Sequence, residues 1–261
     1  FGASVGGPII KNKLFFFANY EGERRTDPGT QFVADRGTGS GGNVTRVKAT
    51  DLDALSKFVG ENFGFETGGY EDYSLITRSD KALLKFDWNI NEKHKLSVRG
   101  NILKSKRDVP ISGSGGFGNR NGNLLSMTYA NSNYEINNDI YSGIAQLNSR
   151  FSNKFSNEMI FGYIANRDYR AEKSISFPTI DILDGNNVNY ISLGSEPFTP
   201  NNLLNTDTWQ FSDNANLYLG KHTLSMGMNY ESFTFFNQFT PTVNGQYVFR
   251  SLAEFYSSAN A

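Results

Sequence analysis

The chain has 261 residues and a net charge of −1, and 38% of its residues are hydrophobic. This charge excludes a global positive field that would hold nucleic acid. The chain contains no cysteine, which excludes disulfides and thiolate metal sites, and no run of about 18 apolar residues, which excludes a transmembrane helix. Because the chain starts at Phe1 and shows no signal peptide, we expect a fragment or a processed chain.

The first 25 residues, FGASVGGPIIKNKLFFFANYEGERR, contain two predicted strands, 2–9 and 14–24, joined by a short polar turn. Phe15 and Phe17 lie near the turn on one face of the second strand, where they could pack on a neighbour or an interior plug. The alternate residues of this strand are predicted to face lipid: Leu14, Phe16, Ala18 and Tyr20.

Six more strands are predicted because apolar and polar residues alternate along them: 80–90, 94–106, 134–151, 155–170, 206–219 and 222–238. The residues that we predict to face lipid are Leu84, Phe86, Trp88, Leu96, Val98, Leu224, Met226 and Met228. The residues that we predict to face the lumen are Glu21, Glu23, Lys85, Asp87, Arg99 and Glu231. Asp213 is an exception, since it falls on the apolar face of its strand.

Short and long connections alternate along the chain. The turns inside each hairpin are short and polar, whereas the connections between hairpins are long: about 25–79, 107–133, 171–205 and from 239 onward. A soluble antiparallel sandwich also has alternating strands, but it gives no reason to sort its loops in this way. We therefore predict an all-β fold, an antiparallel transmembrane β-barrel with short periplasmic turns and long extracellular loops.

The long connections contain local signals. A capping box at Thr50 and Asp53 predicts a helix over about 51–62 in the first long loop, and Ser251 with Glu254 forms a second capping box. The stretch 112–123, SGSGGFGNRNGN, has the composition of a mobile segment. Residues 181–186, DILDGN, could offer oxygen ligands to calcium, although an ordinary Asp-Gly turn is the interpretation we favour.

No catalytic constellation is visible. The two histidines, His94 and His222, lie in or next to predicted turns, and no nucleophile elbow, Walker loop or zinc spacing occurs. We expect no enzyme activity, no cofactor and no metal site. For each predicted lumen-facing charge, an ion pair across neighbouring strands is the alternative to a contact with a plug or a passing solute.

Three segments resemble one family. Residues 6–22 (GGPIIKNKLFFFANYEG), 83–101 (LLKFDWNINEKHKLSVRGN) and 247–256 (YVFRSLAEFY) are similar to barrel segments of TonB-dependent outer-membrane receptors of the Oar-like type, which usually have a carboxypeptidase-regulatory-like domain ahead of a plug. The resemblance implies a 22-stranded barrel in the bacterial outer membrane, closed by a plug and energised by the TonB complex. No ligand-binding residue of the family maps to a fixed motif here.

These observations leave three hypotheses. In the first, residues 1–261 are the N-terminal part of the barrel of a TonB-dependent transporter for a bulky solute, and the plug and remaining strands are absent. In the second, the barrel is a scaffold or adhesin whose long loops bind a surface lipoprotein or another partner protein. In the third, eight strands close a complete narrow barrel that is an enzyme or a structural anchor. The expected partners are outer-membrane lipids, the TonB complex through the missing N-terminal region, and a possible surface lipoprotein, but no nucleic acid.

Overall fold

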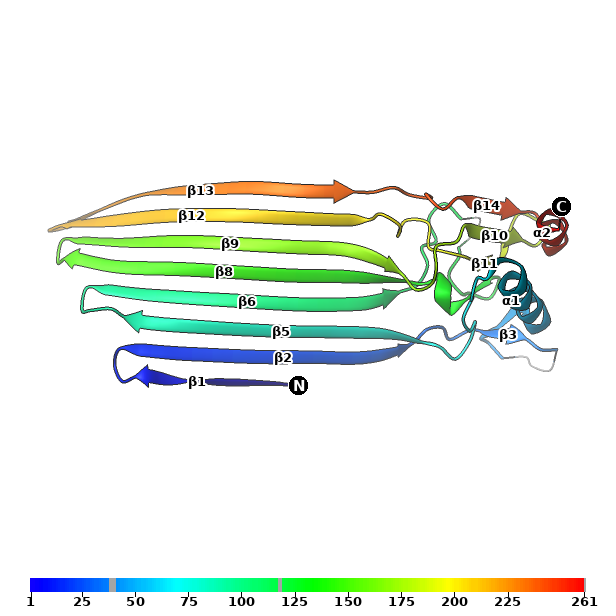
Figure 1. Ribbon diagram of the computed structural model, residues 1–261, viewed down its shortest axis with the longest axis horizontal. Helices are drawn as coiled ribbons and strands as arrows, with labels where there is room; N and C mark the ends of the chain where they lie inside the picture. Colours follow the sequence, from blue (N-terminus) through cyan, green and yellow to red (C-terminus); the bar gives the residue numbers. More distant parts are fainter. Residues whose placement is uncertain (38–40, 117–118, 261) are drawn as a thin grey trace.

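The computed structural model describes residues 1–37, 41–116 and 119–260. It consists of one long sheet and a compact body at one end of that sheet, which we call the cap (Figure 1). The short turns of the sheet lie at the end opposite the cap. The predicted sorting of short and long connections to opposite ends is therefore confirmed.

The long sheet contains eight strands, each antiparallel to its neighbour in chain order. All eight predicted strands are present: β1 (Gly2–Ile10), β2 (Leu14–Pro28), β5 (Ser74–Asn89), β6 (His94–Val109), β8 (Tyr134–Ser152), β9 (Phe155–Glu172), β12 (Leu203–Leu219) and β13 (His222–Gln238). β1 and β13 are the two edges and do not pair with each other, so the described strands form an open wall.

The boundaries of β2 and β5 correct the sequence prediction. Their ladder continues to the pair Pro28 and Ser74, so the first long connection is 29–73 and not 25–79. The charged residues at this end of the two strands were interpreted as loop. The structure places Arg25 and Arg78 in the ladder instead, where Arg25 pairs with Thr77 and Arg78 pairs with Arg24.

Away from the cap end, the alternation of apolar and polar residues is kept in register across all eight strands. Directly paired residues in an antiparallel sheet share a face. One such row contains Gly7, Phe16, Phe86, Val98, Ala145, Phe161, Phe211 and Tyr230. The adjacent row contains Gly6, Phe17, Lys85, Arg99, Ile144, Gly162, Gln210 and Glu231. The wall therefore has an apolar face and a face rich in polar residues, which we call the polar face.

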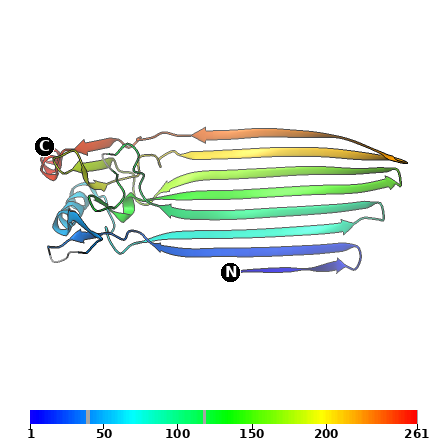
Figure 2. The same cartoon turned by 180° about the vertical axis from the view of Figure 1, so that it is seen from behind.

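The long connections fold together into the cap (Figure 2). The cap contains β3 (Val33–Asp35), β4 (Val44–Lys48), α1 (Ala49–Phe63), β7 (Met127–Thr128), the 3₁₀ turn Ala130–Ser132, β10 (Thr179–Leu183), β11 (Asn189–Leu193), β14 (Gln246–Phe249) and α2 (Leu252–Ala259). Four of these strands form a sheet in the order β14-β10-β11-β7, and β3 pairs with β4. Every long connection contributes to this body.

A hydrophobic core stabilises the cap. Leu52, Leu55 and Val59 of α1 are fully buried, together with Ile182 of β10 and Ile191 of β11. The predicted helix over 51–62 is confirmed, but it begins at Ala49 after Lys48, which makes no side-chain cap, so the expected capping role of Thr50 is wrong. The second capping box is confirmed, because the Ser251 hydroxyl accepts a hydrogen bond from the Glu254 amide.

A buried ion pair links two of the long connections. The side chains of Arg120 and Asp181 are fully buried and bond each other at 2.8–3.1 Å. Arg120 also donates to the carbonyls of Ser112 and Ser114, and the Ser192 hydroxyl donates to Asp181. Residues 117–118 lie outside the described residues, but Arg120 shows that the described part of the expected mobile segment is fixed to β10.

We predict that Arg120→Met loosens the cap, because it leaves the Asp181 carboxylate buried without its cation, at a cost of about 3–5 kcal/mol. The measurement is the rate of protease cleavage within the cap of the purified intact protein, which should rise. The double variant Arg120→Met with Asp181→Leu should restore most of the protection. Lys57→Met, which removes the exposed Lys57–Glu61 pair, is the control and should leave cleavage unchanged.

Candidate functional site

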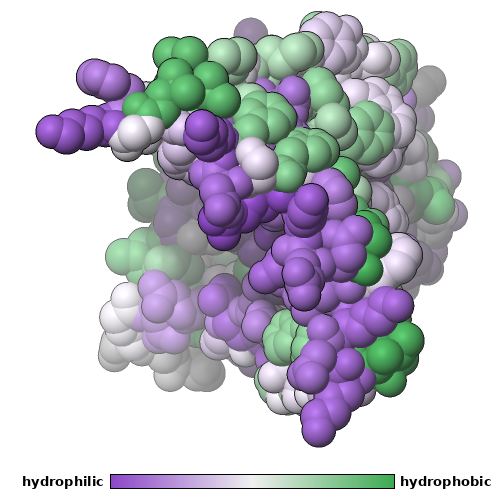
Figure 3. Space-filling model, turned by 90° about the vertical axis from the view of Figure 1, so that its left-hand side faces the viewer, coloured by the Kyte–Doolittle hydropathy of each residue, from purple (hydrophilic) through white to green (hydrophobic). Residues whose placement is uncertain are grey.

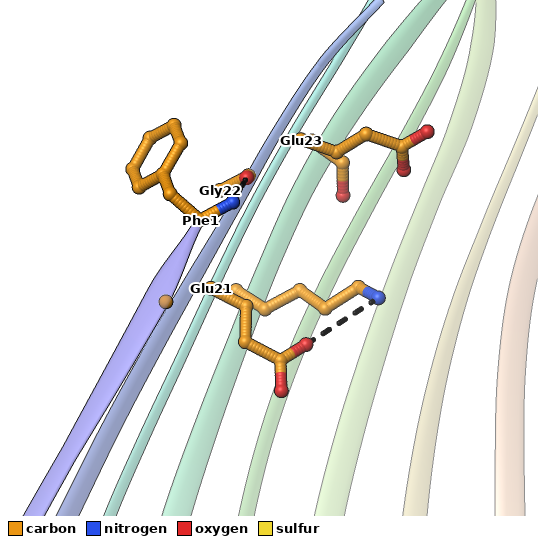
Figure 4. Close-up of a pocket in the computed structure, with 7 residues that line it drawn as sticks. Phe1, Glu21, Gly22 and Glu23 are labelled. Carbon is orange, nitrogen blue, oxygen red and sulfur yellow. Dashed lines mark hydrogen bonds and ion pairs between the residues drawn. The ribbon is translucent and has the colours of Figure 1, made fainter.

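The polar face of the wall contains all six residues that we predict to face the lumen. Strand alternation and the pairing of neighbouring strands place Glu21, Glu23, Lys85, Asp87, Arg99 and Glu231 on this face. Figure 4 shows Glu21 and Glu23 pointing to one side of the sheet edge and the Phe1 ring to the other. Their role in a lumen stays a prediction.

Several of these charges pair with neighbours. The Lys85 ammonium lies 2.8 Å from the Asp87 carboxylate, and the Lys81 ammonium lies 4.0 Å from Glu21 (Figure 4). Glu231 accepts a hydrogen bond of 2.9 Å from the Gln210 amide. Only the Lys81–Glu21 contact is an ion pair across neighbouring strands, as the alternative requires, because Lys85 and Asp87 lie on the same strand and Gln210 is uncharged. Among the described residues, Arg99 and Glu23 take part in no side-chain ion pair.

The polar face is hollowed near the short turns. A hollow of about 520 Å³ is lined there by residues of β6, β8, β9 and β12, among them Lys95, Asn148, Glu158 and Asn214. Sequence reasoning did not single these residues out, although each occupies a polar position of a predicted strand. Amides, an ammonium and a carboxylate can together bond a polar solute or the polar surface of another domain.

The apolar face is exposed over a wide area. Leu84 is 46% exposed, Met226 and Met228 are each 58% exposed, and Trp88 and Val98 are each 41% exposed. Phe86 and Leu224 are also exposed, and Leu96 pairs directly with Trp88 on the same face. These eight residues, all predicted to face lipid, therefore lie on one face. A surface of this kind marks contact with a membrane or with another protein.

Aromatic residues also cluster near the short turns. The rings of Phe151 and Phe155 stack with centroids 5.4 Å apart, and His94 packs edge-on against Phe151. Figure 3, seen from the end with the short turns, shows polar residues gathered over the turns. Aromatic rings followed by polar turns are typical of a membrane–water boundary.

Asp213 lies on the apolar face, as its position in the sequence indicates. Its carboxylate accepts a hydrogen bond of 2.6 Å from the Asn157 side-chain amide, which lies on the same face of β9. The pair compensates part of the cost of placing a carboxylate among apolar side chains.

Residues 184–187, directly after β10, form the Asp-Gly turn that we favoured over a calcium site. The Asp184 carboxylate accepts a hydrogen bond from the Asn186 amide, and Gly185 follows with a φ of +90°. The Arg46 guanidinium beside Asp184 lowers the pKa of this carboxyl to about 2. Asp181 is not part of the turn, since it pairs with Arg120. In the three described ranges, no group of three or more His, Asp or Glu side chains is placed to hold a metal ion.

Neither helix of the described chain is long and apolar enough to cross a membrane. His94 and His222 each begin a strand directly after a short turn, as predicted, and His94 bonds the Ser149 hydroxyl at 2.9 Å.

The chain is similar to known membrane proteins. The family model described as "Outer membrane beta barrel domain" matches residues 1–50 and 46–260. The crystal structure of the outer membrane transporter YddB from Escherichia coli matches with a TM-score of 0.52 and 12% identity, over 90% of this chain and 25% of that chain. The CymD monoaromatic hydrocarbon channel matches with a TM-score of 0.32 and 10% identity, over 88% of this chain and 58% of that chain.

No curated protein matches the chain. The likeness to the YddB structure supports the fold alone, and the chain spans a quarter of the length of that transporter. The family match covers nearly every residue and agrees with a wall whose strands alternate between an apolar and a polar face. The chain therefore belongs to the outer membrane β-barrel domain family and lies in the bacterial outer membrane.

Proposed function

We propose that this chain is part of the barrel wall of a TonB-dependent transporter that moves a bulky solute across the outer membrane. Its apolar face contacts lipid, and its polar face lines the lumen. The observation that carries the proposal is the register of the wall, which keeps apolar and polar rows apart across eight strands. The TonB-dependent part rests on the resemblance of residues 6–22 and 83–101 to Oar-like receptors.

The mechanism in this proposal is gating and not bond chemistry, so the chain is not an enzyme. A plug outside this segment blocks the lumen, and a pull from the TonB complex opens a path along the polar face. The hollow lined by Lys95, Asn148, Glu158 and Asn214 offers donors and acceptors for the plug or the solute. The cap is at the end where the solute enters.

One observation favours a second function, that of a scaffold that binds a surface lipoprotein or another protein. The long connections form a cap with its own core and a buried ion pair. Such a fixed surface binds a partner without a large ordering cost. Exposed apolar residues on the cap, such as Leu124, Leu125 and Tyr247, could contribute to that contact.

The transport proposal is tested in cells that express the intact polypeptide. Compounds removed from the medium are compared between strains with and without the polypeptide, and with and without TonB. At least one compound should require both. If the loss of TonB changes the uptake of no compound, the proposal is contradicted. A lipoprotein that stays bound through purification, without such uptake, would support the scaffold function.

The assignment of the two faces predicts that Leu84→Arg impairs membrane assembly. A cation on the lipid face of a barrel costs about 2–4 kcal/mol at the midplane. The matched control is Lys85→Ala on the neighbouring residue of the same strand, which points to the polar face and should assemble normally. Heat-modifiability on gels measures the assembled fraction, and equal fractions for the two variants would show that the faces are wrongly assigned.

A further inference from the structure

The apolar face is hollowed on β5, β6 and β8. An apolar hollow of about 550 Å³ lies among Ala18, Ala82, Leu84, Gly100, Ile102 and Tyr141. The hollow is deepened by two glycines. Gly100 of β6 pairs directly with Gly143 of β8, so neither strand has a side chain at this position. A Cβ atom added at Gly143 would meet nothing within 4 Å. The hollow is therefore open enough for a slender apolar group.

A second hollow lies on the same face, closer to the cap. It has a volume of about 380 Å³ and is lined by Arg24, Arg78, Lys104 and Lys106, with Asp80 and Asp139 as the carboxylates. Sequence reasoning missed this basic cluster, because it placed residues 25–79 in a loop and so separated Arg78 from its neighbours on β6.

Two of the four cations form no ion pair among the described residues. Arg24 is paired with Asp80, and the Lys106 ammonium lies 2.9 Å from the Glu135 carboxylate. Arg78 and Lys104 are exposed, and neither forms an ion pair with a described carboxylate. Asp80 and Asp139 are the direct ladder partners of Lys104, and its ammonium lies 5.9 Å from the centre of the Tyr141 ring. An arginine and a lysine placed together suit a phosphate, because the guanidinium binds two of its oxygens and the ammonium adds a compact charge.

The two hollows are continuous along the strands. On β6 the successive side chains of this face are Gly100 and Ile102, which line the apolar hollow, and then Lys104 and Lys106, which line the basic one. On β5 the order is Leu84, Ala82, Asp80 and Arg78. Residues two apart on a strand are about 6.6 Å apart, so the combined surface is about 20 Å long.

The geometry points to one binding site for a phosphate-bearing lipid of the leaflet on the cap side. An acyl chain lies in the apolar hollow, and the phosphate is bound by Arg78 and Lys104. The inference rests on the proposed contact of the apolar face with lipid. Free cations on such a face are costly unless an anion pairs with them, and basic clusters at the edge of a membrane attract anionic headgroups. A free phosphate ion would leave the apolar hollow unexplained.

The test uses the intact protein purified in detergent and titrated with phosphorylated lipid A, with dephosphorylated lipid A and with inorganic phosphate, and bound lipid is counted by native mass spectrometry. Phosphorylated lipid A should bind at least about tenfold more tightly than the dephosphorylated form. Arg78→Gln with Lys104→Gln should remove most of that difference. Gly143→Leu, which fills the apolar hollow, should weaken binding of both lipids.

The matched control is Lys85→Gln with Arg99→Gln, which removes two cations from the polar face of the same strands and should leave lipid binding unchanged. All variants are first checked for assembly by heat-modifiability. Equal affinities of the wild type and the Arg78/Lys104 variant, or complete displacement of the lipid by inorganic phosphate, would overturn the site. That failure would leave the assembly defect of Leu84→Arg intact, so it is distinct from failure of the proposed function.

Discussion

The structure depends on one constraint: the side-chain alternation of eight strands must stay in register from β1 to β13. Because a strand repeats every two residues, a slip of one residue on any strand would move its charges to the apolar face. The observed ladders avoid this, as shown by the row from Phe16 to Tyr230 and the row from Phe17 to Glu231. Short turns help to fix this register, since each joins two paired strands with only a few residues. The separation of apolar and polar side chains onto two faces of the wall follows from this register.

The cap shows that the long connections are not independent loops. Their short strands pair across large distances in the chain, as in the parallel pairing of β10 with β14. The core around α1 and the buried Arg120–Asp181 pair hold these pieces together. Since the pieces come from different hairpins, the cap also links the ends of strands that are far apart in the wall. The cap is therefore a fixed body at one end of a wall that has an apolar and a polar face.

The sequence predicted the wall well and the cap poorly, for physical reasons. Alternation is a local signal, so all eight strands and the sharing of faces could be derived from residues such as Leu84 and Lys85. The ends of β2 and β5 were missed because charged residues such as Arg25, Asp27 and Arg78 resemble loop residues until the pairing of the two strands is known. The short strands β10 and β11 are buried on both faces and show no alternation. Arg120 lies in a stretch of Gly and Asn, and only its distant partner Asp181 gives it a role.

The most direct measurement uses introduced cysteines, because the chain itself contains none and each label therefore reports one position. Single cysteines introduced at successive positions of 82–88 and 224–231 carry a fluorescent label in the assembled protein, and the label is quenched by either a lipid-soluble or a water-soluble reagent. The account predicts that accessibility alternates: labels at 84, 86, 226 and 228 respond to the lipid-soluble quencher, and labels at 85, 87, 229 and 231 respond to the water-soluble one. Equal quenching of neighbouring positions by the water-soluble reagent would contradict a wall with one face in hydrocarbon.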